Sequence, residues 1–530
     1  MICAPSGFRF SAKEQSAVTR NILGDEDTFR AVYTLRNVCQ SCLGPHGQCK
    51  LVHNGVGGHV TVTSSASRLL KSTQVTNPVL RLVSTAVQTH LDMHSDGGTM
   101  MATLTLLIIE RALRLQINRR LITDVLDVVT KECIRYMNSN DCPARVSVSL
   151  DSLFDLACVV NGITSTKPAA GMTKADIGHI NQCLVEAFLK TTPDKRETKK
   201  ANADVQYVCV GGRRPAHSYV TNGLFIDSPQ IPTCRTMPLA VRRVPDGARR
   251  GLVATVLYGV SMAGDAEDNL DVEFEVASDL SVDAVVLDEM LKIVGDLVER
   301  GVGLVVCQKV IHPEVKRHLR YRGVLVFDRL GLVQVKLLSR MVGGQLFASF
   351  RTPIDANGFG YVETIKHEVI GGRSYVRVEG AEEQLTTLVL CGLTEESLDE
   401  LKVVCTTANH VLWQTVESGV ALKGGGEWQR CLADHLRGLD CRAMSETLMC
   451  SLSELSIVLE TVAGCFTEIF YAVRGRSVVD AVEVNVRPSE NYFTPGVVLD
   501  CFVPALSAAK GAMFLAHMIL GIKHFICDVN

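Results

Sequence analysis

The hydrophobic pattern of this chain changes twice along its length, and this constrains the fold more than any single motif. Apolar residues recur at helical spacing over 79–91, and a second apolar helix face follows. From about 218 to 360 the pattern changes to short β-rich runs and then to alternating strands and helices. Beyond 400 it becomes helical again and ends in an apolar helix over 505–520. The sequence therefore predicts an α+β multidomain protein whose helical ends flank an α/β centre.

Length and composition narrow the class of protein. The chain has 530 residues, 47% of them hydrophobic, so it can bury the cores of two or three domains. Its net charge of -3 comes from 54 basic and 57 acidic residues that are well mixed, which favours neither nucleic acid nor an acidic membrane surface as a partner. No apolar segment of signal-peptide length stands at the N-terminus, and the 19 cysteines often lie in apolar runs. We therefore expect a cytoplasmic protein with reduced thiols and no membrane insertion.

A glycine-framed turn lies at 43–50, with the sequence LGPHGQCK. Pro45 fixes a turn, while Gly44 and Gly47 let backbone N–H groups approach an anion closely. This pattern indicates a phosphate cradle. The alternative is an ordinary helix C-terminus followed by a Gly–Pro turn. Two alternating segments at 50–53 and 59–63 follow and predict a β-hairpin.

A second turn, SDGGT at 95–99, is predicted to open a helix. Asp96 there could approach a magnesium ion, close to the N–H groups of a helix start. It could equally act as an ordinary helix cap.

Other short motifs are weak. Cys39-x-x-Cys42 has the spacing of half a zinc site, but no second pair follows, so the two are expected to be core sulfur. His90 and His94 are four residues apart, yet HLDMH lacks the glutamate that a metalloprotease needs. No Walker loop or nucleophile elbow is present, which removes the commonest enzyme classes.

Two long ordered strings resemble the group II (TCP-1/cytosolic) chaperonin family. LGPHGQCKLVHNGVGGHVTVTSSASRLL is similar to the family's phosphate loop and stem-loop hairpin, and GLVVCQKVIHPEVKRHL is similar to a strand and helix of its apical domain. The resemblance covers most of the chain. It implies a helical equatorial domain, a small intermediate domain and an α/β apical domain that binds partners. The implied ranges are 1–147 and 413–530 (equatorial), 148–212 and 368–412 (intermediate) and 213–367 (apical).

The resemblance also implies a nucleotide site. The family's LGPxG loop, its GDGTT turn and its glycine stretch beside the nucleotide have counterparts in this chain. The implied nucleotide-binding residues are Leu43, Gly44, Pro45, Gly47, Lys50, Asp96, Gly97, Thr99, Gly424, Gly425 and Gly426, with Asp96 as the magnesium ligand.

Three departures from the family pattern weaken that site. The family's NDG turn reads Ser64, Ser65, Ala66, so a second acidic group near the metal is lost. Its NAGxD segment has no recognisable counterpart. Thr407 stands where the family carries the Asp that activates water, and a neutral hydroxyl cannot accept a proton as a carboxylate can, a help worth roughly 10²–10⁴ in rate. We therefore expect weak or vestigial binding of ATP and magnesium, and no catalytic residue for hydrolysis.

The apical region carries a candidate partner surface. Its apolar residues recur at helical spacing, although such a stripe is more often core than binding surface. The candidate partner-binding residues are Leu287, Met290, Leu291 and Val294.

The expected function is that of a chaperonin-like factor that assists assembly of a multiprotein complex. The resemblance implies that this complex is the BBSome of cilia, and that the chain works with other chaperonin-like proteins and cytosolic chaperonin subunits near the centrosome or basal body. The hairpin would reach toward a neighbouring subunit, because a two-stranded ribbon is marginal alone. Two alternatives stay open: an active ATP-dependent folding subunit and a scaffold that binds no nucleotide.

Overall fold

The chain divides into two compact units in a computed structural model. One unit, here called the helical unit, contains Met1–Val185 and Asp399–Asn530, and the other, the α/β unit, contains Glu186–Leu398. The five domain segments that the sequence suggests are finer than this division and stay a prediction. The residues that the structure describes are 16–20, 22–53, 60–73, 75–192, 205–227, 243–244, 251–262, 282–355, 357–381, 385–475 and 497–528.

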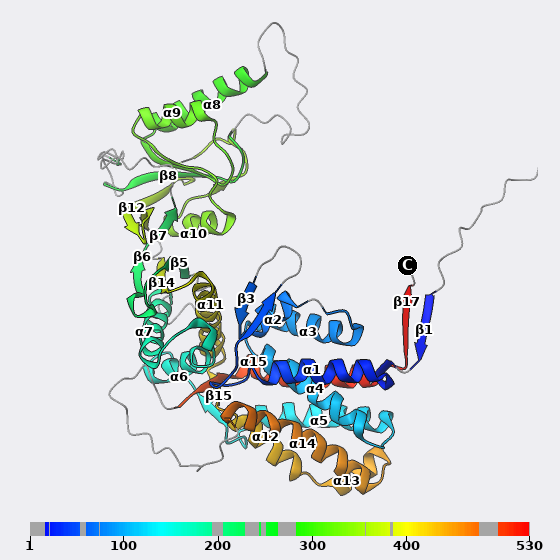
Figure 1. Cartoon of the computed structure of the whole chain (residues 1–530). Helices are drawn as coiled ribbons and strands as arrows, with labels where there is room; N and C mark the ends of the chain where they lie inside the picture. Colours follow the sequence, from blue (N-terminus) through cyan, green and yellow to red (C-terminus); the bar gives the residue numbers. More distant parts are fainter. Residues whose placement is uncertain are drawn as a thin grey trace, which may run out of the picture. The chain divides into compact units, whose positions relative to one another are not determined.

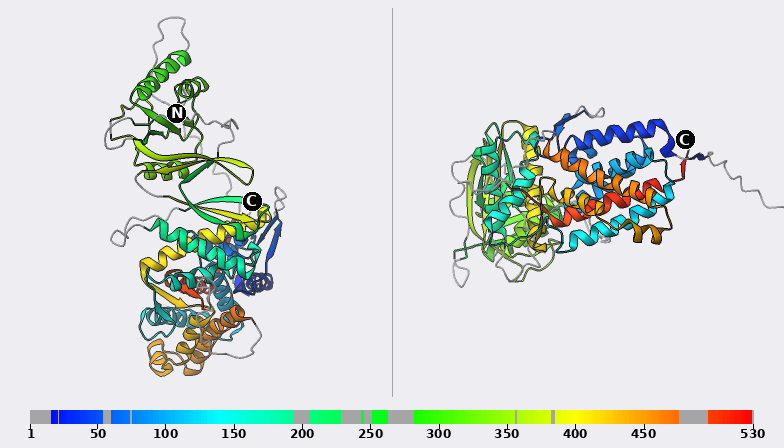
Figure 2. Two further views of the ribbon diagram at one scale, coloured as in Figure 1. Left: turned by 90° about the vertical axis from the view of Figure 1, so that its left-hand side faces the viewer. Right: turned by 90° about the horizontal axis from the view of Figure 1, so that it is seen from below.

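Long helices dominate the helical unit, as the periodicity predicted, and lie side by side (Figure 2, right). Helices α7 and α11 each have residues in both units. The helices are α1 (Glu26–Gln40), α2 (Ala66–Ser72), α3 (Pro78–His94), α4 (Gly98–Arg114), α5 (Arg119–Asn138), α6 (Leu153–Thr164), α7 (Lys174–Thr191), α11 (Glu395–Ser418), α12 (Glu427–Arg437), α13 (Cys441–Leu448), α14 (Leu452–Arg474) and α15 (Phe502–Leu520).

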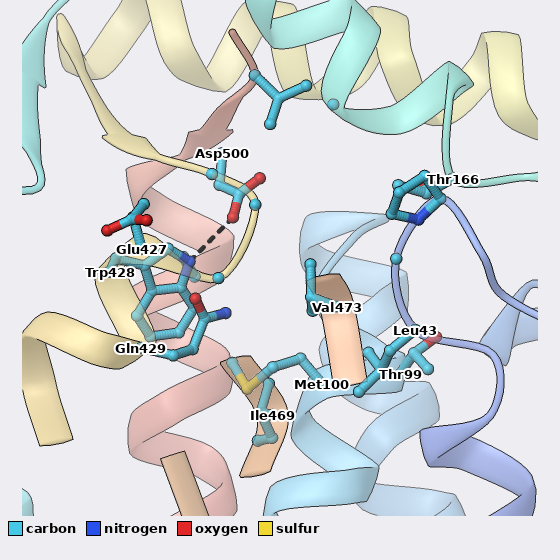
Figure 3. Close-up of a pocket in the computed structure, with 18 of the residues that line it drawn as sticks. Leu43, Thr99, Met100, Thr166, Glu427, Trp428, Gln429, Ile469, Val473 and Asp500 are labelled. Atoms are coloured by element: carbon cyan, nitrogen blue, oxygen red, sulfur yellow. Dashed lines mark hydrogen bonds between the residues drawn. The ribbon is translucent and has the colours of Figure 1, made fainter. Parts of the chain in front are cut away.

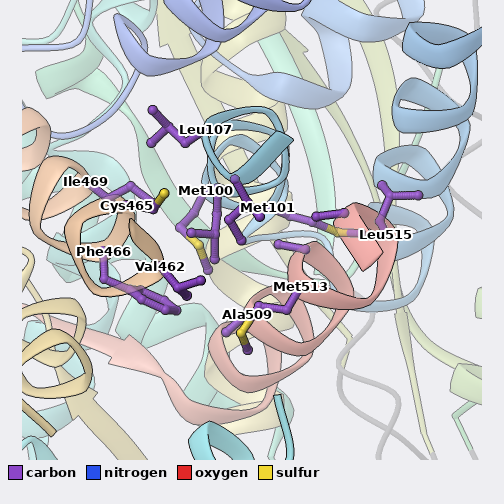
Figure 4. Packing of buried hydrophobic residues seen from close by; sticks show 14 of the residues in the cluster. Met100, Met101, Leu107, Val462, Cys465, Phe466, Ile469, Ala509, Met513 and Leu515 are labelled. Carbon is purple, nitrogen blue, oxygen red and sulfur yellow. The ribbon is translucent and has the colours of Figure 1, made fainter. Parts of the chain in front are cut away.

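Helix α4 is the centre of this unit because it is apolar on nearly every side. It packs against α1, α14 and α15, and an apolar helix surface of this kind is stable only when it is covered all round. Figure 4 shows Met100 and Met101 of α4 packed among Phe466 of α14 and Met513 of α15. By length and composition alone, α14 and α15 could also cross a membrane. In this fold, however, both contribute to the shared core.

Short strands complete the helical unit. The predicted hairpin consists of β2 (Lys50–His53) and β3 (Val60–Thr63), paired antiparallel; the turn between them lies outside the described residues. The strands β1 (Ser16–Arg20) and β17 (His524–Asp528) form a second antiparallel pair. A three-stranded sheet joins β4 (Arg145–Ser147), β15 (Val420–Lys423) and β16 (Leu499–Cys501) in the order β16-β15-β4.

The α/β unit contains two sheets, which confirms the α/β centre predicted from the sequence (Figure 1). The larger has the order β10-β9-β8-β12-β13-β7, with β11 beside β8, and the smaller has the order β5-β14-β6. Its elements are β5 (Val205–Gly211), β6 (Tyr219–Asn222), β7 (Leu224–Asp227), β8 (Val253–Tyr258), α8 (Val282–Glu299), β9 (Val302–Cys307), α9 (Pro313–Tyr321), β10 (Leu325–Phe327), α10 (Leu332–Val342), β11 (Leu346–Phe347), β12 (Gly360–Ile370), β13 (Arg373–Gly380) and β14 (Thr386–Gly392).

Helices cover both faces of the larger sheet. Side chains alternate between the faces of a strand, so Val305 of β9 joins a core with α8 and α9, while Val306 joins a core with α10 (Figures 1 and 2). This explains why β8 and β9 read as continuous apolar runs, since both of their faces are buried.

The candidate partner stripe on α8 is largely core, and this part of the prediction is wrong. Met290 is 1% exposed and Val294 is 0% exposed, because both side chains face the sheet. Leu287 and Leu291 are half-buried and pack against the same core. A partner cannot reach the two buried side chains without unfolding the helix from its sheet.

Candidate functional site

A cavity of about 560 Å³ lies in the helical unit, within the size range of small-molecule sites. Its wall comes from the loop after α1, the turn before α4, the loop after α6, the end of β15 and the last turn of α14. In Figure 3, Leu43, Thr99 and Thr166 lie on one side of the cavity, and Trp428 and Asp500 lie on the other. Segments far apart in the sequence therefore meet here.

The predicted phosphate loop follows directly from the end of α1. Gly44 has a φ of 73°, a conformation that residues with a side chain rarely adopt. The Gly47 N–H donates to the Gly44 carbonyl at 3.1 Å, and a Cβ on Gly47 would come within 2.7 Å of the Cys42 carbonyl. Both glycines are therefore needed for the tightness of the loop itself.

Two of the predicted glycines also meet the end of α14. A Cβ on Gly44 would lie 2.4 Å from the Val473 carbonyl oxygen, and a Cβ on Gly426 would lie 2.9 Å from the Phe470 ring. Packing against α14 thus explains these glycines without a ligand. The cavity nevertheless stays open beside them, since Gly44, residues 424–426 and Val473 all contribute to its wall.

The turn before α4 holds Asp96 in the cavity wall. Ser95 and Gly97 on either side are both left-handed, with φ of 62° and 80°. The buried His90 ring places Nε2 2.8 Å from the Asp96 carbonyl oxygen, so this nitrogen carries the proton and donates. Burial lowers the pKa of His90, which keeps the ring neutral. The backbone of the turn is therefore fixed while the Asp96 carboxylate lies at the cavity.

Thr407 of α11 lies beside the same turn. Its hydroxyl is 3.5 Å from the Ser95 carbonyl oxygen, and its side chain is half-buried. The cavity wall does not include it. The residue that the resemblance predicts in place of the family's Asp thus contacts the turn that carries Asp96.

The two acids of α11 nearest in sequence to Thr407 do not replace the missing one. Glu400 is fully buried, accepts hydrogen bonds from the Thr63 hydroxyl at 3.0 Å and the Ser64 N–H at 3.4 Å, and pairs with Arg68 at 3.0 Å. The Asp399 side chain is 70% exposed. A buried carboxylate bound on these sides is a structural anchor rather than a free base.

The most strongly perturbed acid of the cavity, Asp500, was missed from the sequence. It is the middle residue of β16 and is half-buried, and its Oδ2 accepts a hydrogen bond from the Trp428 indole at 2.9 Å. Burial, with a smaller contribution from the negative charge of Asp96, raises its pKa to about 6. A lone acid within the apolar run VVLDCFV was the available signal.

Lys167 and Lys423 also line the cavity and were not predicted. They lie in the segments ITSTKP and ALKGGG, respectively. At the opposite wall Glu427 pairs with Arg430 at 2.9 Å and with Arg474, whose guanidinium also lies 4.9 Å from the centre of the Phe470 ring. The wall therefore combines three cationic side chains with three carboxylates: Lys167, Lys423 and Arg474 with Asp96, Glu427 and Asp500.

The structure thus brings most of the predicted nucleotide residues together. Gly47 and Lys50 are outside the wall: the first shapes the loop, and the Lys50 ammonium donates to the Gln48 carbonyl at 3.2 Å. Whether any of these residues contacts a nucleotide stays a prediction. The predicted residues in the wall are Leu43, Gly44, Pro45, Asp96, Gly97, Thr99, Gly424, Gly425 and Gly426.

Within the part of the chain that the structure describes, no three His, Cys, Asp or Glu side chains group as a metal site would require. Cys39 is 1% exposed, and burial raises its pKa to about 12, which suits core sulfur. The rings of His90 and His94, in the same helix, have their centres 4.9 Å apart, and His90 is hydrogen-bonded to the Asp96 carbonyl.

Comparisons with known proteins agree with the motifs. The model of the TCP-1/cpn60 chaperonin family matches residues 35–484. The human protein named molecular chaperone MKKS is 30% identical over 455 residues, which cover 85% of this chain and 78% of the human one. Its mouse counterpart is 32% identical over 430 residues, 81% of this chain and 74% of the mouse one. Thermosome subunit alpha of Sulfolobus acidocaldarius is 24% identical over 470 residues, 85% of this chain and 80% of the archaeal one. The chain therefore belongs to the TCP-1/cpn60 chaperonin family and is a chaperonin-like chaperone.

Proposed function

We propose that this chaperonin-like chain assists the assembly of a multiprotein complex and binds nucleotide in its cavity without hydrolysing it. The proposed absence of hydrolysis rests on one observation. Thr407, at the position where the resemblance expects the family's water-activating Asp, contacts the Asp96 turn. A hydroxyl cannot take a proton from water near neutral pH, and general-base help of this kind is worth roughly 10²–10⁴ in rate.

Nearby acids do not compensate. Glu400 is bound by Arg68 and Thr63, and Glu427 is bound by Arg430. Asp500 is held by Trp428 on the side of the cavity away from the phosphate loop (Figure 3). Nucleotide would therefore serve as a bound ligand that stabilises one conformation of the chain, since a ligand that binds only the folded form adds stability by mass action.

Exposed strand edges support association with other chaperonin-like chains. In the hairpin, Leu51 is 70% exposed and Val60 is 50% exposed, which is unusual for apolar strand residues unless another chain covers them. The pair β1–β17 is likewise only two strands wide among the described residues. A two-stranded ribbon gains stability by adding strands, so we propose pairing with other chaperonin-like proteins and with cytosolic chaperonin subunits.

The client and the location follow only from the family resemblance. We propose that the assembled complex is the BBSome, that the chain acts in the cytoplasm, and that it collects at the centrosome or basal body. Native mass measurement of the purified chain, alone and after mixing with cell extract, tests this. Co-assembly with chaperonin-like proteins and BBSome subunits is the expected result, and a chain that recovers neither class of protein contradicts it.

Single-turnover hydrolysis of labelled ATP tests the loss of catalysis. The purified chain should retain ATP and release no phosphate above the uncatalysed background. Release at ordinary chaperonin rates would instead identify an active folding subunit.

A scaffold that binds no nucleotide is the second candidate. The observation in its favour is the close approach of α14 to Gly44 and Gly426, which accounts for these glycines by packing alone. Equilibrium dialysis with ATP separates the two, because a pure scaffold retains none.

A further inference from the structure

One glutamine side chain connects the two sheets of the α/β unit. Strand β7 stands at one end of the larger sheet, where it pairs with β13. A strand at the end of a sheet has backbone N–H and C=O groups on its outer side that no further strand pairs. At Phe225 of β7, these groups bond to the side chain of Gln206, which belongs to β5 of the smaller sheet.

This contact is reciprocal, and we call it the Gln206 bridge. The Phe225 N–H donates to Gln206 Oε1 at 2.7 Å, and Gln206 Nε2 donates to the Phe225 carbonyl at 2.7 Å. A side-chain amide carries the same donor and acceptor as a peptide group, so Gln206 pairs with Phe225 as one residue of a further strand would. Because Phe225 is 1% exposed, loss of the amide would leave two buried backbone groups without a partner.

An apolar core shared by the two sheets lies beside the Gln206 bridge. The Phe225 and Tyr375 rings meet edge to face in this core, with their centres 6.2 Å apart. Gly371, in the turn between β12 and β13, lies so close to β5 that a Cβ would come within 2.6 Å of a Val210 methyl group. The two sheets therefore pack directly on each other. The core contains Val208, Val210, Val389 and Cys391 from the smaller sheet and Phe225, Ile370 and Tyr375 from the larger one.

The chain passes between the two sheets from β6 to β7 and again from β13 to β14 (Figure 1). Gly223 alone separates β6 from β7, and its N–H donates to the carbonyl of Leu385, the residue before β14, at 2.7 Å. The buried Thr387 hydroxyl donates to the Gly223 carbonyl at 2.6 Å and also lies 2.9 Å from Gln206 Oε1. Rotation of one sheet against the other about Gly223 would therefore break these bonds together with the Gln206 bridge.

The chaperonin resemblance divides this unit between an apical and an intermediate domain, which would allow the two sheets to move separately. We propose that the Gln206 bridge fixes the smaller sheet to the larger one, so that the α/β unit moves as one body and does not open at Gly223. The unit then offers its surfaces to partners in one fixed arrangement.

Two fluorophores test the motion of the sheets directly. They are introduced through non-canonical amino acids at Ala216, which is exposed beside the smaller sheet, and at Tyr321, which is 88% exposed on α9 beside the larger sheet. Single-molecule energy transfer in the purified full-length chain should give one narrow distribution. A broad or two-peaked distribution in the wild-type chain would show that the sheets move separately, and would overturn the proposal.

Gln206→Met tests the bridge itself, because it removes both hydrogen bonds and keeps a side chain of similar length. Hydrogen exchange followed by mass spectrometry should show the amides of 222–227 exchanging roughly tenfold to a hundredfold faster than in wild type, the usual effect of losing a buried hydrogen-bonding partner. The energy-transfer distribution should broaden as well. Amides of β9, within the larger sheet, should stay as protected as in wild type, which shows that the variant is folded.

Gln206→Glu is a second variant with a different side chain. It keeps an acceptor for the Phe225 N–H but places an oxygen against the Phe225 carbonyl, so it should speed exchange in the same amides. Unchanged exchange and unchanged energy transfer in both variants would show that Gln206 does not join the sheets. Equal loss of protection in β9 would mean that the bridge stabilises the whole unit and not the junction, and would also overturn the proposal.

Gln345→Met supplies the matched control, since Gln345 is an exposed glutamine of the same unit. It should leave the exchange of 222–227 and the energy transfer unchanged, and a change equal to that of Gln206→Met would remove the special role of Gln206. These measurements need neither ATP nor a partner protein, so their outcome is independent of the proposed function.

Discussion

The Trp428 indole N–H donates a 2.9 Å hydrogen bond to Oδ2 of Asp500, a half-buried residue in the middle of β16. Burial raises the pKa of Asp500 from its ordinary 3.8 to about 6. The folded state therefore holds on to a proton that the unfolded state releases between about pH 4 and pH 6, so this group lowers stability as the pH rises through that window. Above pH 6 this cost in folding free energy is constant, at roughly 3 kcal/mol.

Asp500→Asn should accordingly stabilise the protein at neutral pH. The Asn side-chain oxygen can still accept from Trp428, while the charge that burial penalises is gone. We expect a gain of up to about 3 kcal/mol at pH 7.5 and a smaller gain at pH 4.5, measured by urea denaturation. Asp92→Asn, at an exposed site, is the control. A gain that is equal at both pH values would contradict the raised pKa.

The same hydrogen bond can be tested by removing its donor, the Trp428 indole. Trp428→Phe removes the donor but keeps an aromatic ring, so the ionised Asp500 loses its partner in a buried site. We expect a loss of about 1–3 kcal/mol at pH 7.5, in addition to the packing effect of the smaller ring. In the Asp500→Asn background the loss should shrink, because a neutral amide needs the donor less. An unchanged loss in that background would mean that only the ring volume matters.

Much of this cavity was accessible from the sequence because its residues lie in contiguous motifs. The Gly44 loop and the Asp96 turn are each specified by neighbours within a few positions, since left-handed turns need glycine or short polar residues there. The fold class followed from periodicity in the same way. Local pattern therefore identified two walls of the site.

Asp500, Trp428 and Lys167 were missed because their roles depend on contacts between distant segments. Trp428 and Asp500 are 72 residues apart, and only the packing of α12 beside β16 makes the indole a donor to the carboxylate. The prediction of a partner-binding stripe on α8 was wrong for a related reason. Periodicity shows that Met290 and Val294 share a face, but whether a sheet covers that face is decided by tertiary structure.

The covered face of α8 makes a direct comparison possible on one helix. Met290→Asp puts a charge into a core position that is 1% exposed, whereas Val285→Asp puts the same charge at a position that is 49% exposed. The first should lower stability of the α/β unit by roughly 3 kcal/mol or more, and the second by about 0.5 kcal/mol or less. Limited proteolysis and urea denaturation measure this. If Met290→Asp is tolerated as well as Val285→Asp, α8 does not pack on the sheet.

Gly44 offers a second matched pair, this time with another glycine. Gly44 and Gly212 have similar left-handed backbones, with φ of 73° and 76°, but a Cβ meets the Val473 carbonyl at 2.4 Å in the first and nothing within 4 Å in the second. Gly212→Ala should cost about 1–2 kcal/mol, the backbone strain alone. Gly44→Ala should cost at least about 2 kcal/mol more, because α14 must move away. Equal costs would show that α14 does not press on the phosphate loop.

Thr407→Asp tests whether one carboxylate is what separates this chain from an ATPase. The Thr407 hydroxyl lies 3.5 Å from the Ser95 carbonyl, so an acid there would lie beside the Asp96 turn. If the cavity still orients ATP, phosphate release in single turnover should rise by roughly 10²-fold or more over wild type. Thr406→Asp is the matched control. The Thr406 side chain is next in sequence but exposed, and its hydroxyl donates to the Lys402 carbonyl instead of facing the Ser95 turn. Equal release by the two variants, or rapid release by wild type, would show that Thr407 does not limit hydrolysis.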